Sequence, residues 1–158
     1  MFRELARQNK KISDSECIEI LKNEPRGVLS VLGDDDYPYG VPMDHWYCEE
    51  DGCIYFHSGN TGHKIDAIRK HDKVSFCVYD QGYRKEGEWA LNIRSVVVFG
   101  RVKIVEDREK AIDVTRKLSY KYTQDTDYIE NEIRLYSSGL LCFALVPEHM
   151  TGKLVNES

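Results

Sequence analysis

The sequence predicts a mainly β fold: a small six-stranded antiparallel barrel, closed or partly closed, with a few helices. Three observations support this prediction. Short apolar segments alternate with turn residues, the turns between the first three segments are short, and helical periodicity is confined to a few stretches between them. Close strand–turn–strand spacing is typical of hairpins, and a sheet that curls on itself leaves fewer apolar edges open.

The individual elements follow from local signals. Ser13 and Glu16 form a capping-box pattern, which predicts a helix that ends before Pro25. Strands are expected at residues 27–33, 39–48, 53–58, 73–80, 89–105 and 140–155. Further helices are expected at residues 62–71, 106–122 and 127–136. Pro42 removes a backbone donor, so the second strand should have an edge, a bulge or a ligand there, and Gly100 predicts a bend in the fifth strand.

Length and charge narrow the class of protein. The 158 residues suit one domain, expected to span residues 1–158, and the net charge of −5 disfavours nucleic-acid binding. No apolar run is long enough for a membrane helix, and the N-terminus lacks the apolar core of a signal peptide, so a cytoplasmic location is expected. The acidic run at residues 34–36 lacks the spacing of a calcium loop and predicts a solvated turn.

The cysteines and histidines do not form a recognisable metal motif. Five cysteines without CxxC spacing predict reduced thiols, with a Cys48–Cys53 pairing as the less favoured alternative. The five histidines show no HxxxH or HExxH pairing, so no metal site is expected. Core packing is the commoner role for four aromatic residues that could also stack on a flat ring: Trp46, Tyr47, Tyr83 and Trp89.

The stretch FHSGNTGHK, residues 56–64, is the sharpest local feature. It joins an expected strand to an expected helix, and Gly59 and Gly62 would let a ligand approach the backbone. Lys64 falls in the first helical turn, where a cation is unfavourable unless an anion offsets it. The spacing is not that of a nucleotide-binding P-loop. From local spacing alone, an ordinary turn is favoured over a phosphate site.

Three longer segments then carry a resemblance to a known family. They are RGVLSVLGDDDYPYGVPMDHWY (26–47), IYFHSGNTGHKIDAIRKHDKVSFCV (54–78) and RSVVVFGRVKIVED (94–107). In order and spacing they resemble the FMN-binding split barrels related to pyridoxamine 5′-phosphate oxidase, and within them the nitroimidazole-resistance branch. The resemblance covers about residues 11 to 150. It implies a six-stranded split barrel that forms a homodimer with FMN at the interface.

The resemblance also implies which residues bind the cofactor. Lys64 would contact the FMN phosphate, and His57 and Ser58 would line the phosphate and ribityl side. Arg94 and Ser95 would contribute from another strand, from the partner subunit. Backbone groups along the isoalloxazine ring would come from four consecutive residues: Tyr39, Gly40, Val41 and Pro42. No side chain is assigned as catalytic.

The implied activity is flavin chemistry on a small electron-poor acceptor such as a nitroaromatic, with electrons from NAD(P)H or a partner reductase. The alternative is a flavin- or haem-binding module without turnover. A histidine near the flavin is implied for the branch; His45 or His57 could be that residue, although His45 is more commonly a barrel-facing or surface polar residue. The tail MTGKLVNES lacks the arginine and histidine pattern that holds pyridoxamine phosphate, so oxidation of vitamin B6 is not implied.

Overall fold

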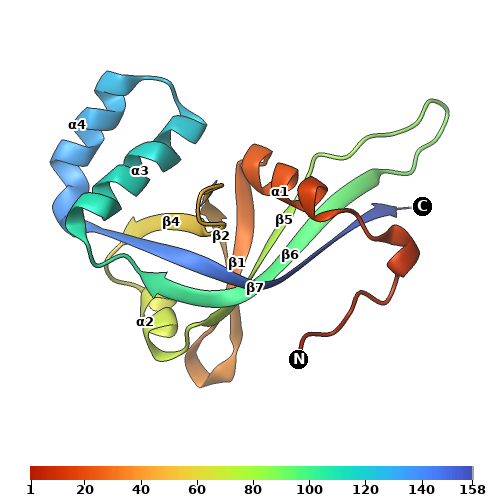
Figure 1. The fold of residues 1–158 in the computed structure, drawn as a ribbon, viewed down its shortest axis with the longest axis horizontal. Coiled ribbons are helices and arrows are strands. Elements are labelled where there is room, and N and C mark those ends of the chain that lie inside the picture. Colours follow the sequence, from red (N-terminus) through yellow and green to blue (C-terminus); the bar gives the residue numbers. More distant parts are fainter. Residues whose placement is uncertain (158) are drawn as a thin grey trace.

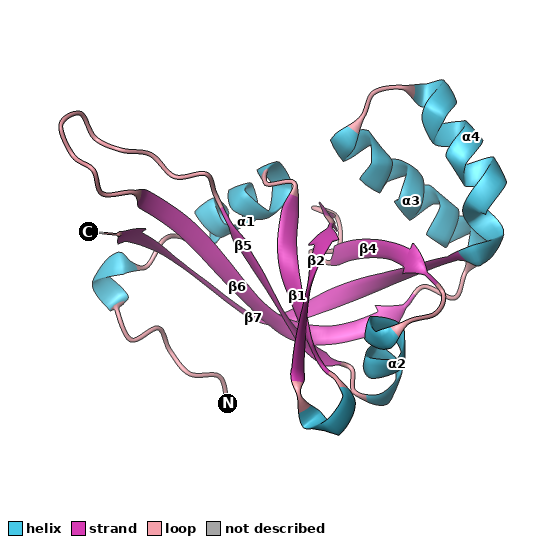
Figure 2. Ribbon diagram, turned by 180° about the vertical axis from the view of Figure 1, so that it is seen from behind, coloured by secondary structure: helices cyan, strands magenta, loops and turns pink. Residues whose placement is uncertain are grey.

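The computed structural model describes residues 1–157 as a curled antiparallel sheet with helices at its ends and on one face (Figures 1 and 2). The strands run in the order β2-β1-β5-β6-β7-β4-β3. Their bounds are β1 Arg26–Leu32, β2 Pro38–Asp44, β3 Trp46–Tyr47, β4 Ile54–Gly59, β5 Lys73–Tyr79, β6 Asn92–Ile104 and β7 Leu140–Asn156. The helices are α1 Asp14–Asn23, α2 His63–Lys70, α3 Arg108–Tyr122 and α4 Thr126–Tyr136, with short 3-10 turns η1 Gln8–Lys10, η2 Asp34–Asp36 and η3 Ser137–Gly139. The mainly β, antiparallel prediction is confirmed.

The predicted number of six strands is wrong, because the sheet has seven. The segment expected as one strand at residues 39–48 is broken at His45 into β2, which pairs with β1, and β3, which pairs with β4. At the break the His45 backbone N–H donates to the Tyr122 hydroxyl at 2.9 Å instead of to a neighbouring strand. The Tyr122 side chain of α3 therefore ends β2, and the chain after the break pairs with β4 instead of β1.

The local signals at α1 are confirmed. The Ser13 hydroxyl accepts from the Glu16 backbone N–H, and the Glu16 carboxylate accepts from the Ser13 N–H at 2.9 Å, which completes the capping box. The helix packs against β6 and β7 and buries Cys17. Gly152 on β7 makes this close approach possible, since a Cβ there would lie 2.4 Å from Cys17 Sγ.

Two irregularities expected from proline and glycine are also confirmed. Pro42 lies in β2, which is the edge strand at one end of the sheet, so its missing N–H costs no ladder bond to a further strand. The register of β6 against β7 shifts between Phe99 and Gly100. A Cβ on Gly100 would lie 2.2 Å from the Val146 carbonyl oxygen, so the strands cross too closely there for any side chain.

The main core fills the inside of the curled sheet. Phe56 packs edge-on against Phe76 at 5.0 Å between ring centroids and stacks on Phe143 at 5.1 Å, and all three rings are fully buried. A second, smaller cluster lies where α3 covers β4 and β7, around Tyr55 and Cys142. The α3–α4 hairpin extends from this end of the sheet (Figure 1), and α4 packs mainly against α3.

The predictions for the aromatic residues, the acidic turn and the cysteines are confirmed only in part. Trp46 and Tyr47 are half-buried, but Trp89 and Tyr83 are 74% and 52% exposed, so the core-packing prediction is wrong for these two. Both lie in the long loop between β5 and β6, whose tip extends away from the sheet (Figure 1). The acidic turn at residues 34–36 is exposed as predicted, and the five cysteines are free thiols. No helix within residues 1–157 is both long and apolar enough to cross a membrane.

Candidate functional site

The corner between β4 and α2 has the properties of an anion site. The N-cap of α2 is Gly62, whose φ of 126° favours glycine, and no side chain caps the helix. A Cβ on Gly59 or Gly62 would meet nothing within 4 Å, so the space beside both glycines is open. Lys64 is half-buried in the first turn and forms no ion pair with any residue in the described range 1–157. Uncapped N–H groups, open glycines and a free lysine fit a phosphate group.

A neighbouring histidine that the sequence reasoning missed holds this corner in place. The His63 ring stacks on Tyr39 with 4.2 Å between centroids, and its Nε2 accepts from the Asp34 backbone N–H at 3.3 Å. Gly33 leaves room for the ring, because a Cβ there would lie 2.8 Å from His63 Nε2. The start of α2 is thus packed against the β1–β2 turn, and Tyr39 lies against His63, the first residue of the helix. The only signal in the sequence was the position of His63 next to Lys64.

The edge strand β2 leads away from this corner. Gly40, Val41 and Pro42 pair with β1 on one side, and the other side of β2 has no ladder partner among residues 1–157. Outward-facing backbone N–H and C=O groups of an edge strand are available to a ligand. The far end of β2 is Asp44, which lies near His57 of β4. Within one chain, the structure therefore brings together the predicted groups of β2, β4 and α2.

A cavity of about 320 Å³ opens at that far end, between the α3–α4 hairpin and the sheet. Asp44 and His57 line its floor, while Tyr122 of α3 and Tyr136 of α4 are among its walls. Burial lowers the pKa of His57 below its ordinary value, and the nearby Asp44 opposes this only in part, so the ring is neutral at pH 7. The imidazole is half-buried and can either donate a hydrogen bond to a molecule in the cavity or accept one from it.

His45, the other histidine considered from the sequence, is not part of this cavity. Its ring is fully buried, and Nε2 lies 2.8 Å from the Leu21 carbonyl oxygen. Lys121 Nζ donates to the His45 carbonyl at 3.0 Å, and the Tyr122 hydroxyl donates to the Pro25 carbonyl. These contacts tie the end of α3 to α1 and to the break between β2 and β3. His45 is therefore a structural residue, and the geometry favours His57 as the histidine near a ligand.

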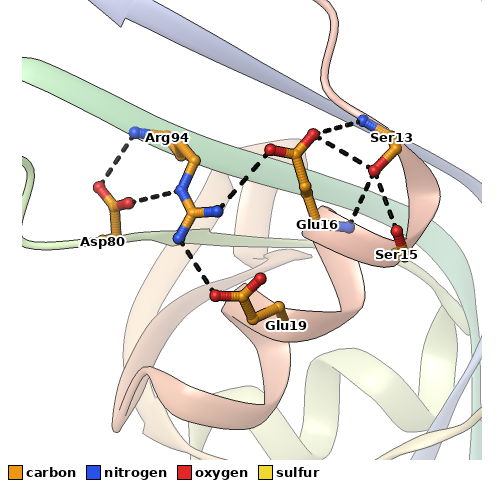
Figure 3. A network of polar contacts seen from close by, with 6 residues as sticks. All are labelled: Ser13, Ser15, Glu16, Glu19, Asp80 and Arg94. Carbon is orange, nitrogen blue, oxygen red and sulfur yellow. Dashed lines mark hydrogen bonds and ion pairs between the residues drawn. The ribbon is translucent and has the colours of Figure 1, made fainter.

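Arg94 and Ser95 lie far from the other predicted residues in the same chain. Arg94 pairs with Leu154 and Gly59 pairs with Leu140, at opposite ends of the 17-residue strand β7. The Arg94 guanidinium is held by carboxylates (Figure 3): Nε donates to Asp80 at 2.9 Å, and the terminal nitrogens lie 3.6 Å from Glu19 and 3.9 Å from Glu16. A contact of Arg94 or Ser95 with a cofactor stays a prediction that needs a second chain.

Residues 13–154 match the family described as pyridoxamine 5′-phosphate oxidase. The chain belongs to the pyridoxamine 5′-phosphate oxidase family. No curated protein matches the chain. Within residues 1–157, no group of three or more histidine, cysteine or acidic side chains is arranged to hold a metal ion.

Solved structures share the fold of this family member at low sequence identity. A candidate 5-nitroimidazole antibiotic resistance protein from Bacteroides thetaiotaomicron has a TM-score of 0.76 and 20% identity, covering 92% of this chain and 87% of that one. A FAD-binding protein from Mesorhizobium loti has a TM-score of 0.65 and 24% identity, with coverages of 92% and 97%. A FAD- and haem-binding protein from Mycobacterium smegmatis has a TM-score of 0.74 and 16% identity, with coverages of 94% and 74%.

Proposed function

We propose that this protein binds FMN and reduces a small electron-poor acceptor, such as a nitroaromatic compound. One observation carries the proposal: the anion corner and the cavity lie at the two ends of β2. A cofactor that joins one phosphate to a flat ring through a flexible chain fits this arrangement. The phosphate would lie at Lys64, and the ring would lie along Gly40–Pro42 beside the cavity.

The corner supports FMN rather than FAD as the cofactor. It offers one helix N-terminus and one unpaired lysine, which suits a single terminal phosphate. Ser58 at the end of β4 adds a hydroxyl beside this position. Flavin-binding proteins among the structural neighbours support a flavin in general. When bound, the flavin supplies hydride and electron transfer, while the chain anchors the phosphate and positions the ring.

The cavity supports the acceptor part of the proposal. It is next to the proposed ring position, and seven of its fourteen lining residues are apolar or aromatic. The neutral His57 at its floor can donate one hydrogen bond to an acceptor oxygen without adding a charge. Electrons would come from NAD(P)H or from a partner reductase.

A homodimer would complete the site, because Arg94 and Ser95 can reach a cofactor only in a second copy. The sheet face turned away from the core supports such a contact. One row of residues in register crosses that face: Pro42, Val28, Cys77, Val97 and Thr151. Four of the five side chains are apolar, and Val28 is 37% exposed. Apolar positions on an uncovered sheet face favour association of two copies.

Replacement of the corner lysine is expected to weaken FMN binding. Lys64→Ala removes the charged donor and should reduce the binding free energy by about 1.5–3 kcal/mol, the scale of a hydrogen bond between charged groups. Fluorescence titration with FMN measures the change. Lys70→Ala, at the other end of the same helix, is the matched control and should bind FMN like the parent. Equal affinities for the two variants would place the phosphate elsewhere.

The activity itself is tested on purified protein saturated with FMN under anaerobic conditions. We expect NAD(P)H to bleach the flavin absorbance and a nitroaromatic compound to restore it. A flavin that stays oxidised with NAD(P)H but cycles with an added reductase indicates a partner-fed enzyme. A flavin that cycles under neither condition indicates a binding module without turnover, and a protein that takes up no FMN contradicts the proposal entirely.

A further inference from the structure

We propose that the cavity beneath the α3–α4 hairpin binds a flat aromatic molecule that carries a positive charge, and that Glu132 selects for this charge. The proposal names the class of acceptor, so for turnover it rests on the proposed function. Binding in the cavity, however, needs only this chain. The two proposals can therefore fail separately.

The shape of the cavity favours a single small ring system. Its volume of about 320 Å³ lies at the lower end of the range for small-molecule pockets, roughly 300–1,000 Å³. Three residues at helical spacing on α4 form one wall: Tyr128, Glu132 and Tyr136. Tyr122 of α3 and Leu140 of β7 face the same space. Aromatic and aliphatic walls of this kind favour a flat apolar ring.

The charge of the lining favours a cation. Of residues 1–157, two carboxylates line the cavity and no lysine or arginine does. Asp44 is compensated by Arg26, whose Nε lies 2.9 Å away. Glu132 is half-buried and has no basic nitrogen within 4.0 Å anywhere in the part of the chain that the structure describes. The cavity thus keeps one uncompensated negative charge.

Among residues 1–157, the neighbouring cations form their hydrogen bonds and ion pairs with groups other than Glu132. Lys121, at the end of α3, donates to the His45 and Leu21 carbonyls at 3.0 and 3.3 Å. On α4 and α3, Arg134 bonds to the Asn131 side chain, and Arg116 to Glu130. His57 is neutral because burial lowers its pKa, and burial raises the pKa of Tyr122 to about 12. None of these cations contacts Glu132, which leaves its carboxylate available to a cationic ligand.

A cationic ring gains from the walls as well as from Glu132. Tyrosine faces attract cations, and a carboxylate in partly apolar surroundings interacts with an opposite charge more strongly than one in water. A neutral ring of the same shape keeps only the stacking, and an anionic ring is repelled. The structure therefore predicts a ranking among ligands of equal shape.

Three indoles of similar size test this ranking by calorimetric titration: tryptamine (cationic), tryptophol (neutral) and indole-3-propionate (anionic). Tryptamine is expected to bind at least about tenfold more tightly than the other two, a difference of roughly 1.4 kcal/mol. Glu132→Gln should remove this preference and leave the affinity for tryptophol unchanged. Glu109→Gln, at an exposed position near the start of α3, is the matched control and should keep the preference.

Two further measurements locate the site. Ile133→Trp fills the cavity and should abolish binding of all three indoles. On the unaltered protein, added salt should weaken tryptamine binding and spare tryptophol binding. A lack of preference for tryptamine, or a preference that survives Glu132→Gln, overturns the proposal. The titrations are run with and without FMN: tryptamine preference without FMN uptake refutes only the proposed function, and Lys64-dependent FMN uptake without the preference refutes only the cavity proposal.

Discussion

Acidification from pH 6.5 to pH 3 is expected to lower the free energy of unfolding by about 4 kcal/mol through His45 alone. Burial, followed by the nearby charge of Lys121, lowers the pKa of His45 to about 3. Its Nε2 bonds to the Leu21 carbonyl, and its buried Nδ1 has no partner among residues 1–157. Protonation would therefore place an uncompensated charge beside an existing cation.

The direction of the effect follows from the lowered pKa. The unfolded chain binds a proton near pH 6.5 and the folded chain does so only near pH 3, so the stabilisation is present above pH 6.5 and is lost as the pH falls toward 3. Urea denaturation of the parent and of His45→Gln, repeated across this range, isolates the effect, because titration of the carboxylates is common to both. We expect the two stability curves to converge with acid.

A matched control tests whether replacing any histidine changes the acid sensitivity of the protein. His71→Gln changes an exposed histidine, and its curve should run parallel to that of the parent. If the His45→Gln curve is also parallel to the parent curve, the buried ring does not carry the acid sensitivity.

Gly100→Ala is expected to destabilise the protein by about 3 kcal/mol or more. The new Cβ would lie 2.2 Å from the Val146 carbonyl oxygen, which belongs to the backbone of β7 and cannot rotate away as a side chain would. Relief requires β6 and β7 to separate at the register shift, and these two strands form the longest pairing in the sheet. Thermal and urea denaturation measure the loss.

The control for this substitution is Gly139→Ala. A Cβ at Gly139 would meet nothing within 4 Å, so its stability should stay within about 1 kcal/mol of the parent. Similar stabilities for the two variants would show that the strands at Gly100 separate without cost.

The parts of the fold that the sequence predicts correctly depend on neighbours in the chain. The capping box at Ser13 needs only Glu16. The missing N–H of Pro42 predicted an edge, a bulge or a ligand, and the structure has an edge strand there. The break at His45 depends on the hydroxyl of Tyr122, which lies 77 positions away in the chain. No local sequence pattern predicts such a contact. For that reason one strand was expected at residues 39–48, where the structure has two.

The candidate site also has one part that depends on neighbours in the chain and one part that depends on distant contacts. The anion corner is continuous in sequence from Ser58 to Lys64, so its chemistry is visible before folding. The cavity is not, because Glu132 reaches the neighbourhood of His57 only when α4 packs against α3 at this end of the sheet. The carboxylates around Arg94 likewise come from α1 and the end of β5, which are distant in the chain (Figure 3).

The position of the α3–α4 hairpin has a consequence for the evolution of ligand preference. Both helices belong to one uninterrupted segment between β6 and β7, and this segment supplies most of the cavity walls (Figure 1). The corner at α2 and the edge strand β2 are encoded in a different part of the chain. Substitutions or length changes within the hairpin can therefore change which ligand binds in the cavity. The corner at α2 and the edge strand β2, which lie elsewhere in the chain, stay the same.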